Sequence, residues 1–259
     1  FPNHEANPLE PENLRDLQAA VREHGADIGL AFDGDADRCF VVDERGEPVT
    51  PSAITALVAQ REVDRAVAAG ASAQDVAVVH NAIASQVVPE VIEAAGARPV
   101  RTRVGHSFIK DEMARHDAVF GGEHSAHYYF KDFWFADTGM LAALHVLAAL
   151  GEQDRPLSEL MAPYEKYPAS GEINSRVEDA AAATERVRAW GAAQGAQADE
   201  LDGLTLTGTA LEGEEVGYWR ANLRASNTEP LLRLNVESVS QELTARVRDA
   251  ALALVRQDG

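Results

Sequence analysis

The spacing of apolar residues changes along the chain, and each spacing predicts a different element. In residues 11–25, which end in Gly25, apolar positions recur every three or four residues, as in a helix with one buried face. Two short apolar runs, residues 27–32 and 39–43, have the length and the bounding turns of strands. We expect these three elements to form part of an α/β unit.

The next segment alternates helices with strands. Its pattern predicts, in chain order, a helix at 51–70 that Ser52 can cap, a strand at 76–79, a helix at 85–95 and a strand at 98–104. Alternation of this kind indicates a parallel sheet, whose ligands gather at the carboxyl ends of its strands. Gly105 and Glu123 both follow expected strands, so we expect a binding site around them.

The pattern changes again near residue 156. The expected order from there is helix 157–164, strand 172–177, helix 180–193, strands 203–207, 218–223 and 231–236, and helix 241–256. The predicted fold class is therefore α/β, with two three-layer α/β units of mainly parallel strands, the first incomplete, followed by a smaller α+β domain. The expected domains are residues 1–50, 51–155 and 156–259.

Composition restricts the partners and the location of the chain. A formal net charge of -19 over 259 residues argues against nucleic acid, whose phosphates would be repelled, although residues 98–110 contain basic side chains and no acid. The longest apolar run, residues 140–150, is too short to span a bilayer, so no membrane partner is expected. The single cysteine, Cys39, excludes an internal disulfide and fits a cytoplasmic protein.

An acidic turn follows the first expected strand. Asp33, Asp35 and Asp37 occupy alternate positions in the sequence Asp-Gly-Asp-Ala-Asp-Arg, and hard carboxylate oxygens at a strand end suit Mg²⁺. Arg38 is a cation beside these acids and can meet a substrate phosphate. The turn therefore favours a magnesium site that serves phosphoryl chemistry.

Two other interpretations of the acidic turn remain. The spacing of its acids also matches a calcium-binding EF-hand loop, but Arg38 stands at the sixth position, where that loop needs glycine for its sharp turn. A solvated acidic turn without a ligand is the plainer alternative, because charge-rich loops are common.

Four segments resemble, in order, the alpha-D-phosphohexomutase family. They are Asp33-Gly34-Asp35-Ala36-Asp37-Arg38, Val104-Gly105-His106-Ser107-Phe108-Ile109-Lys110, Gly122-Glu123-His124-Ser125-Ala126-His127 and Arg224-Ala225-Ser226-Asn227-Thr228-Glu229-Pro230. The resemblance extends over essentially the whole chain, and the phosphomannomutase/phosphoglucomutase branch fits best. One such segment would be weak support, but four in the family's order are specific.

The resemblance implies a role for each segment. The first would bind Mg²⁺ through Asp33, Asp35 and Asp37, and the second would contact substrate through Gly105 and His106. Glu123 and Ser125 would hydrogen-bond two adjacent sugar hydroxyls, which are nearly the same in glucose and mannose. Many relatives have glycine where this chain has Ala126, so the backbone of this loop can differ.

The resemblance also implies the residues that move protons and hold phosphate. His127 would be the general acid or base and Arg38 a catalytic and phosphate-binding cation, whereas a lone histidine without the resemblance is more often structural. The phosphate-binding residues would be Arg224, Ser226, Asn227 and Thr228, with Arg233 on the following strand. The alternative is a polar hairpin turn, since turns favour serine and asparagine.

The implied reaction is the reversible conversion of hexose 6-phosphate and hexose 1-phosphate. A phosphoserine would give its phosphoryl group to the sugar. The resulting hexose 1,6-bisphosphate would reverse its orientation in the site and return the other phosphoryl group to the serine. The family's serine segment, similar to Thr-Ala-Ser-His-Asn-Pro, does not occur here, and the opening residues resemble the interior of the family's second domain. We therefore expect the back portion of a longer enzyme, which binds hexose phosphates without turnover.

Three other functions stay open from the sequence. A phosphoglucosamine mutase is the nearest competitor within the family, and a non-catalytic phosphosugar-binding module is the second alternative. A metal-dependent sugar phosphatase would also use an aspartate-rich strand end, but it needs an aspartyl nucleophile and has no use for a remote phosphate site. The sequence leaves the preferred hexose and the oligomeric state open, with a monomer as the expectation.

Overall fold

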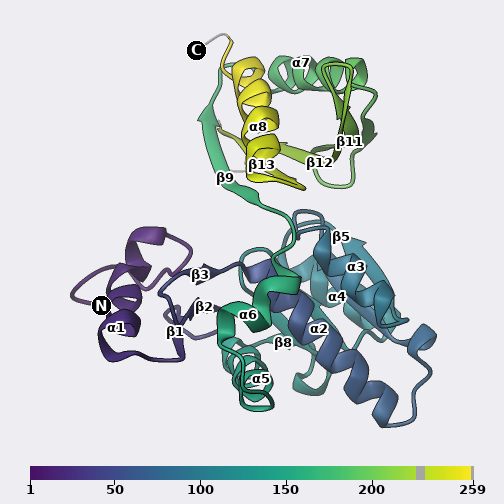
Figure 1. Cartoon of the computed structure of the whole chain (residues 1–259). Coiled ribbons are helices and arrows are strands. Elements are labelled where there is room, and N and C mark those ends of the chain that lie inside the picture. The colour runs from purple at the N-terminus through teal and green to yellow at the C-terminus, as the bar shows by residue number, and fades with distance from the viewer. Residues whose placement is uncertain (226–230, 258–259) are drawn as a thin grey trace. The chain divides into compact units, whose positions relative to one another are not determined.

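The computed structural model of the chain describes residues 1–225 and 231–257 (Figure 1). Contacts between residues divide the chain into two compact units, Phe1–Lys166 and Tyr167–Gly259. None of the helices among the described residues combines the length and the apolar character that crossing a bilayer requires.

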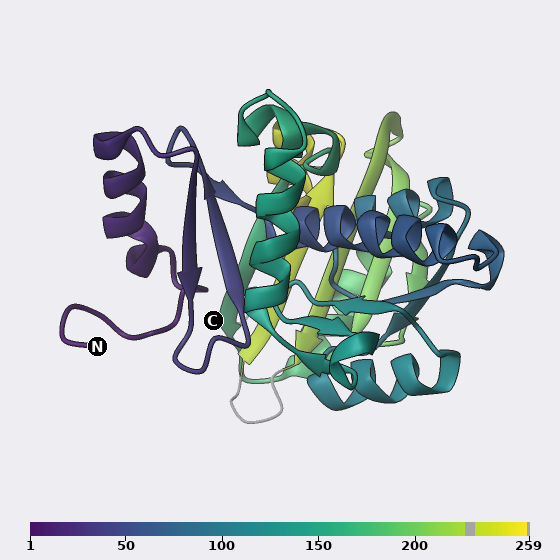
Figure 2. The ribbon, with the colours of Figure 1, turned by 90° about the horizontal axis from the view of Figure 1, so that it is seen from below.

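The first unit begins with a small antiparallel sheet covered by a helix. A 3₁₀ turn, Pro11–Leu14, leads into α1 (Arg15–His24), which ends at Gly25 in the left-handed conformation, and β1 (Ile28–Phe32), β2 (Cys39–Asp43) and β3 (Pro48–Val49) follow. Figure 2 shows β1 and β2 side by side with α1 next to them. The expectation of mainly parallel strands is wrong here, because the short loop 33–38 cannot form the crossover that parallel strands need.

The larger sheet of the first unit is mixed. Its elements are α2 (Pro51–Ala68), a 3₁₀ turn Ala73–Asp75, β4 (Ala77–Asn81), α3 (Val87–Ala94), β5 (Arg98–Thr102), α4 (His106–His116), β6 (Phe120–Gly122), β7 (Tyr128–Phe130), a 3₁₀ turn Lys131–Phe133, β8 (Ala136–Asp137), α5 (Gly139–Gly151), α6 (Leu157–Met161) and a 3₁₀ turn Ala162–Tyr164. The strand order is β5-β4-β6-β7-β8. The first three strands are parallel, as expected, and β7 and β8 add antiparallel partners.

Two adjacent glycines show that helices cover both faces of this sheet. A Cβ atom on Gly121 would lie 2.7 Å from Met113 of α4, whereas one on Gly122 would collide with Thr55 of α2. Since successive strand residues face opposite sides, α4 and α2 pack on opposite faces and leave no room for side chains at these positions. The result is the three-layer α/β arrangement expected from the sequence.

Local details differ from the sequence prediction at two places. Thr50, not Ser52, caps α2, because its hydroxyl accepts the backbone N–H of Ala53. Residues 128–130 and 133–135 form an aromatic run whose composition predicts strand core rather than a surface on which a sugar stacks. The second half of this run instead forms a turn in which Trp134 is 83% exposed with φ +57°. The first half is confirmed as buried strand, with Tyr128 and Tyr129 both 0% exposed.

The second unit is an antiparallel sheet with two helices on one face. It contains β9 (Ala169–Arg176), α7 (Ala180–Ala193), β10 (Gln197–Asp199), β11 (Leu204–Leu211), β12 (Glu214–Ala225), β13 (Leu231–Ser238) and α8 (Gln241–Val255), in the sheet order β10-β11-β12-β13-β9. Trp219 of β12 and Val247 of α8 share its buried core. Helix α6, expected in this unit, contacts α2 and belongs to the first.

Candidate functional site

The acidic loop between β1 and β2 folds around Arg38. Asp33, at the end of β1, is buried and accepts two hydrogen bonds from Arg38, one from the backbone N–H at 3.1 Å and one from Nε at 2.7 Å. Ala36 takes φ +61°, so the chain turns sharply between the acids. Asp33, Asp35 and Asp37 each present a carboxylate oxygen within 4.8 Å of the others. This spacing brings the three expected metal ligands together.

Asp37 has the electrostatic environment that a cation would relieve. Burial, together with the neighbouring carboxylates of Asp33 and Asp35, raises the pKa of Asp37 to about 6. Its Oδ1 atom is buried and has no hydrogen-bond partner among the described residues. A divalent cation would offset both the repulsion and the unsatisfied oxygen, so the donor set fits Mg²⁺.

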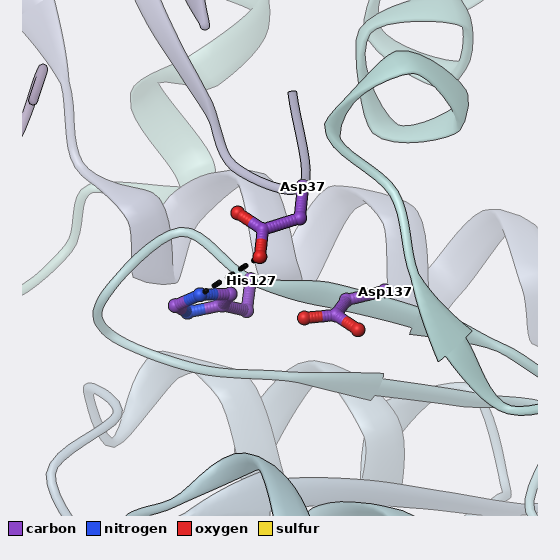
Figure 3. Close-up of side chains that lie close together, drawn as sticks. All are labelled: Asp37, His127 and Asp137. Atoms are coloured by element: carbon purple, nitrogen blue, oxygen red, sulfur yellow. Dashed lines mark ion pairs between the residues drawn. The ribbon is translucent and has the colours of Figure 1, made fainter. Parts of the chain in front are cut away.

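A second loop, residues 123–127 between β6 and β7, lies directly against the acidic loop although it is far away in sequence. Arg38 forms an isolated antiparallel bridge with His127, and the N–H of Cys39 donates to the carbonyl of Ala126 at 3.3 Å. Figure 3 shows the imidazole of His127 beneath the Asp37 carboxylate, with Nε2 and Oδ2 separated by 3.7 Å, and Asp137 beside them. The fold thus brings the acidic loop and a histidine to one place.

Glu123 lies deep in this second loop and is firmly held. It is 3% exposed, and it accepts hydrogen bonds from the N–H of Gly105 and from the hydroxyl of Tyr129, both at 3.0 Å. The amide of Asn81, at the end of β4, approaches its Oε1 atom at 3.4 Å. A buried carboxylate with three donors is a rigid hydrogen-bond acceptor at the carboxyl edge of the sheet.

His127 lies between Glu123 and the acidic loop. Its Nδ1 atom is 2.9 Å from the Ser125 hydroxyl and 3.6 Å from Oε2 of Glu123. Burial lowers the pKa of His127 below its ordinary value, against the opposing influence of Glu123 and Asp137. The imidazole is therefore neutral near neutral pH, as a group that accepts a hydroxyl proton must be.

The structure also places the other expected substrate contacts. Gly105 caps α4 with φ +131°, a conformation that glycine adopts readily, and His106 begins that helix as an exposed residue. The hydrogen bond from Gly105 to Glu123 brings this segment next to the Glu123–His127 loop. Ala126 takes φ +69°, the conformation for which glycine is favoured.

In the second unit two arginines face each other across adjacent strands. Arg224 of β12 and Arg233 of β13 are register partners, and both approach Glu172, at 3.7 and 3.4 Å. The Nε atoms of both arginines are buried and lack a hydrogen-bond partner in residues 1–225 and 231–257. Glu172, together with Asp202 at 3.8 Å from Nη1 of Arg224, offsets the repulsion between these two like charges. Ser226, Asn227 and Thr228, expected in the same site, lie outside the described residues.

Comparison with known families covers nearly the whole chain. Models of phosphoglucomutase/phosphomannomutase domains match three consecutive segments: alpha/beta/alpha domain II at residues 1–46, alpha/beta/alpha domain III at 50–167 and the C-terminal domain at 172–254. The chain belongs to the alpha-D-phosphohexomutase family. The acidic loop lies in the segment matched to domain II, and Glu123 and His127 lie in the segment matched to domain III.

Individual relatives agree with this assignment. A phosphomannomutase of Salmonella typhimurium is 42% identical over 260 residues, which cover 99% of this chain and 54% of the relative. A crystal structure of a phosphoglucomutase/phosphomannomutase family protein from Burkholderia thailandensis has a TM-score of 0.81 at 28% identity, covering 100% of this chain and 53% of that one. The chain spans about half the length of the curated relatives it matches.

A more distant structure shows the same fold with ligands. The N-acetylphosphoglucosamine mutase of Aspergillus fumigatus, crystallised with GlcNAc-6P and magnesium, has a TM-score of 0.64 at 20% identity, covering 88% of this chain and 48% of that chain.

Three residues of the site were missed by sequence reasoning. Tyr129 was expected only as strand core, and nothing singled out Asn81 or Asp137, although Asp137 pairs with Lys110 at 2.9 Å and lies close to His127. Tyr129 could have been found, because it stands two residues after His127 and alternate strand residues face the same side. The positions of Asn81 and Asp137 depend on contacts between distant strands, which local spacing does not reveal.

Proposed function

We propose that this chain provides the metal-binding and sugar-phosphate-binding parts of a phosphomannomutase/phosphoglucomutase, which interconverts hexose 6-phosphate and hexose 1-phosphate through a hexose 1,6-bisphosphate. One observation supports the proposal above all others. The bridge between Arg38 and His127 joins two loops distant in sequence, so that Asp37 and His127 lie 3.7 Å apart. A cation-binding group and a proton acceptor at one point are what phosphoryl transfer to a hydroxyl requires.

Asp33, Asp35 and Asp37 would hold Mg²⁺, and the magnesium complex of the Aspergillus fumigatus relative supports this choice of metal. When bound, the ion supplies positive charge that stabilises the phosphoryl group during its transfer. Arg38, fixed by Asp33 and by a 3.1 Å hydrogen bond from Nη1 to Asn7, adds a second positive charge beside the loop. His127 takes the proton from the sugar hydroxyl that receives the phosphoryl group.

Each unit carries residues to which we assign substrate contacts. Glu123 and Ser125 accept and donate hydrogen bonds to neighbouring sugar hydroxyls, while Gly105 and His106 line the same edge of the sheet. Arg224 and Arg233, with Ser226, Asn227 and Thr228, bind the phosphate that does not react. Two guanidinium groups whose Nε atoms have no hydrogen-bond partner among the described residues favour this role over a polar turn.

The 259 residues contain no serine segment of the family's catalytic type, so the phosphoserine would come from outside them. We expect this chain alone to bind hexose phosphates as a monomer without turning them over. A cytoplasmic location fits its one buried cysteine, Cys39, whose pKa burial raises to about 12.

Calorimetry with glucose 6-phosphate in the presence of Mg²⁺ tests the proposal. The chain should bind this ligand, and Arg224→Ala should weaken binding by about 1.5 to 3 kcal/mol, the value of a hydrogen bond to a charged group. Arg246→Ala is the matched control, because Arg246 pairs with Glu212 on the surface of the same unit. Equal affinities of the two variants would contradict the assignment of the phosphate site.

Two further measurements separate the rival functions. Release of inorganic phosphate from glucose 6-phosphate by this chain would favour a phosphatase. Kinetics of the gene's full-length product with mannose 6-phosphate, glucose 6-phosphate and glucosamine 6-phosphate would distinguish a mutase from a binding module and would identify the preferred sugar.

A further inference from the structure

The Glu123 carboxylate has most of its hydrogen-bonding capacity filled by the protein itself. Oε1 accepts from the N–H of Gly105 at 3.0 Å and lies 3.4 Å from the amide nitrogen of Asn81. Oε2 accepts from the hydroxyl of Tyr129 at 3.0 Å. A carboxylate has about four acceptor positions, two on each oxygen. The three donors of the protein therefore leave about one acceptor position open, and this position is on Oε2.

The remaining acceptor position faces the reacting side of the site. Oε2 lies 3.6 Å from Nδ1 of His127, whose other neighbour is the Ser125 hydroxyl at 2.9 Å. Asn81 is anchored in turn, because its Oδ1 atom accepts the N–H of Ala84 at 2.9 Å. The two carboxylate oxygens of Glu123 are therefore held by different elements, Oε1 by the end of β4 and the N-cap of α4, and Oε2 by β7.

We propose that the hydroxyl of Tyr129 is a positioning group, which fixes Oε2 of Glu123 so that this oxygen accepts one sugar hydroxyl of the ligand. The inference rests on the proposed function of the site, and it adds a specificity-determining residue to it. Tyr129 is 0% exposed and does not touch the ligand itself. Without its hydroxyl, the buried Oε2 would lose its only close protein donor among the described contacts and the carboxylate would turn.

The preceding residue, Tyr128, provides a matched control. Tyr128 is also 0% exposed and lies on the same strand, but its hydroxyl donates to the carbonyl of Cys39 at 3.4 Å. Tyr128→Phe and Tyr129→Phe each remove one buried hydroxyl and keep the ring. Only the second removes a donor to Glu123.

The first experiment measures discrimination between ligands by calorimetry. We expect one of 3-deoxy and 4-deoxy glucose 6-phosphate to bind the original chain about tenfold more weakly than glucose 6-phosphate, the loss of about one hydrogen bond. In Tyr129→Phe the ratio of the two dissociation constants, deoxy sugar to glucose 6-phosphate, should be close to one, whereas Tyr128→Phe should keep the ratio of the original chain. A Tyr129→Phe variant that keeps the ratio would overturn the proposal, because a merely structural tyrosine would change stability and not discrimination.

The second experiment does not depend on the ligand. A crystal structure of Tyr129→Phe should show the Glu123 carboxylate rotated away from its position in Tyr128→Phe, and an unchanged carboxylate would overturn the inference. If the original chain binds no hexose phosphate, the proposed function fails, and the two crystal structures still decide whether Tyr129 positions Glu123.

Discussion

Asp37 is the residue of the acidic loop whose pKa is raised by its surroundings. Its carboxylate is about one third exposed, lies beside Asp33 and Asp35, and has a pKa of about 6, compared with an ordinary value of 3.8. Because the folded state binds the proton more tightly than the unfolded state does, this group makes the metal-free protein less stable as pH rises between those two values. A proton and a metal ion therefore compete for the same oxygen atoms.

We predict that acid weakens metal binding in a defined interval. With a pKa of about 6, Asp37 is mostly protonated at pH 5 and mostly ionised at pH 7, so the dissociation constant for Mg²⁺ should be about tenfold higher at pH 5. Isothermal titration with Mg²⁺ or Mn²⁺ at the two pH values measures this change. The Asp37→Asn variant should bind the metal ion weakly at both pH values and should lose the pH dependence. Equal affinity of the original chain at both pH values would refute the assignment of Asp37 as a ligand.

The sequence predicted which residues lie together where the signal is local. The three aspartates of the acidic loop lie together because their alternate spacing follows directly from the end of β1. For Tyr129 the local spacing places its side chain on the same side as His127, but its bond to Glu123 depends on the hairpin between β6 and β7. Trp134 was predicted wrongly, because aromatic residues usually signal burial and the left-handed turn at this position exposes the ring.

At the scale of elements, the start of α5 supports the acidic loop. The N–H of Gly139, the first residue of α5, donates to the carbonyl of Ala36 at 3.0 Å. A Cβ atom at this position would lie 2.5 Å from the backbone carbon and oxygen of Arg38 and 2.9 Å from the nitrogen of Cys39. These are backbone atoms, so a side chain here can be accommodated only if the loop or the helix moves.

Gly139→Ala should therefore destabilise the chain by about 1 to 3 kcal/mol, the usual cost of overpacking, and should also weaken Mg²⁺ binding. Gly151→Ala, at the other end of α5, is the control, because no atom lies within 4 Å of its Cβ position. We expect that variant to be about as stable as the original chain or slightly more stable. Urea unfolding and metal titration of both variants check this, and unaltered metal affinity in Gly139→Ala would show that α5 does not support the loop.

The elements themselves were predictable to different degrees for physical reasons. Helix α7 was expected at residues 180–193 and is found at Ala180–Ala193, since Asp179 caps it through its side chain. Helix α4 was not expected, because Gly105 offers no side chain as an N-cap and the helix carries no acid in its first turn. The parallel pairing of β4 with β5 and β6 was expected, but the antiparallel pairs β1–β2 and β6–β7 were missed, because direction depends on which strands meet in the sheet.

At the scale of the whole molecule, the two units have separate cores. The core of the second unit is built from the sheet β10-β11-β12-β13-β9 with α7 and α8, and it includes Trp219 and Val247. The expected metal ligands all belong to the first unit, within Phe1–Lys166. A ligand that binds only one folded unit stabilises only that unit, unless the two unfold together.

We predict two calorimetric unfolding transitions that respond to different changes. Mg²⁺ at a hundred times its dissociation constant should stabilise the first unit by about 2.7 kcal/mol and leave the other transition in place. Val247→Ala should lower the free energy of unfolding of the second unit by about 2 kcal/mol, because the removed methyl groups are fully buried. The transition of the first unit should not move. Scanning calorimetry of the original chain and of Val247→Ala, each with and without Mg²⁺, tests this prediction. A single transition that shifts with the metal and with the substitution would show that the two units unfold as one.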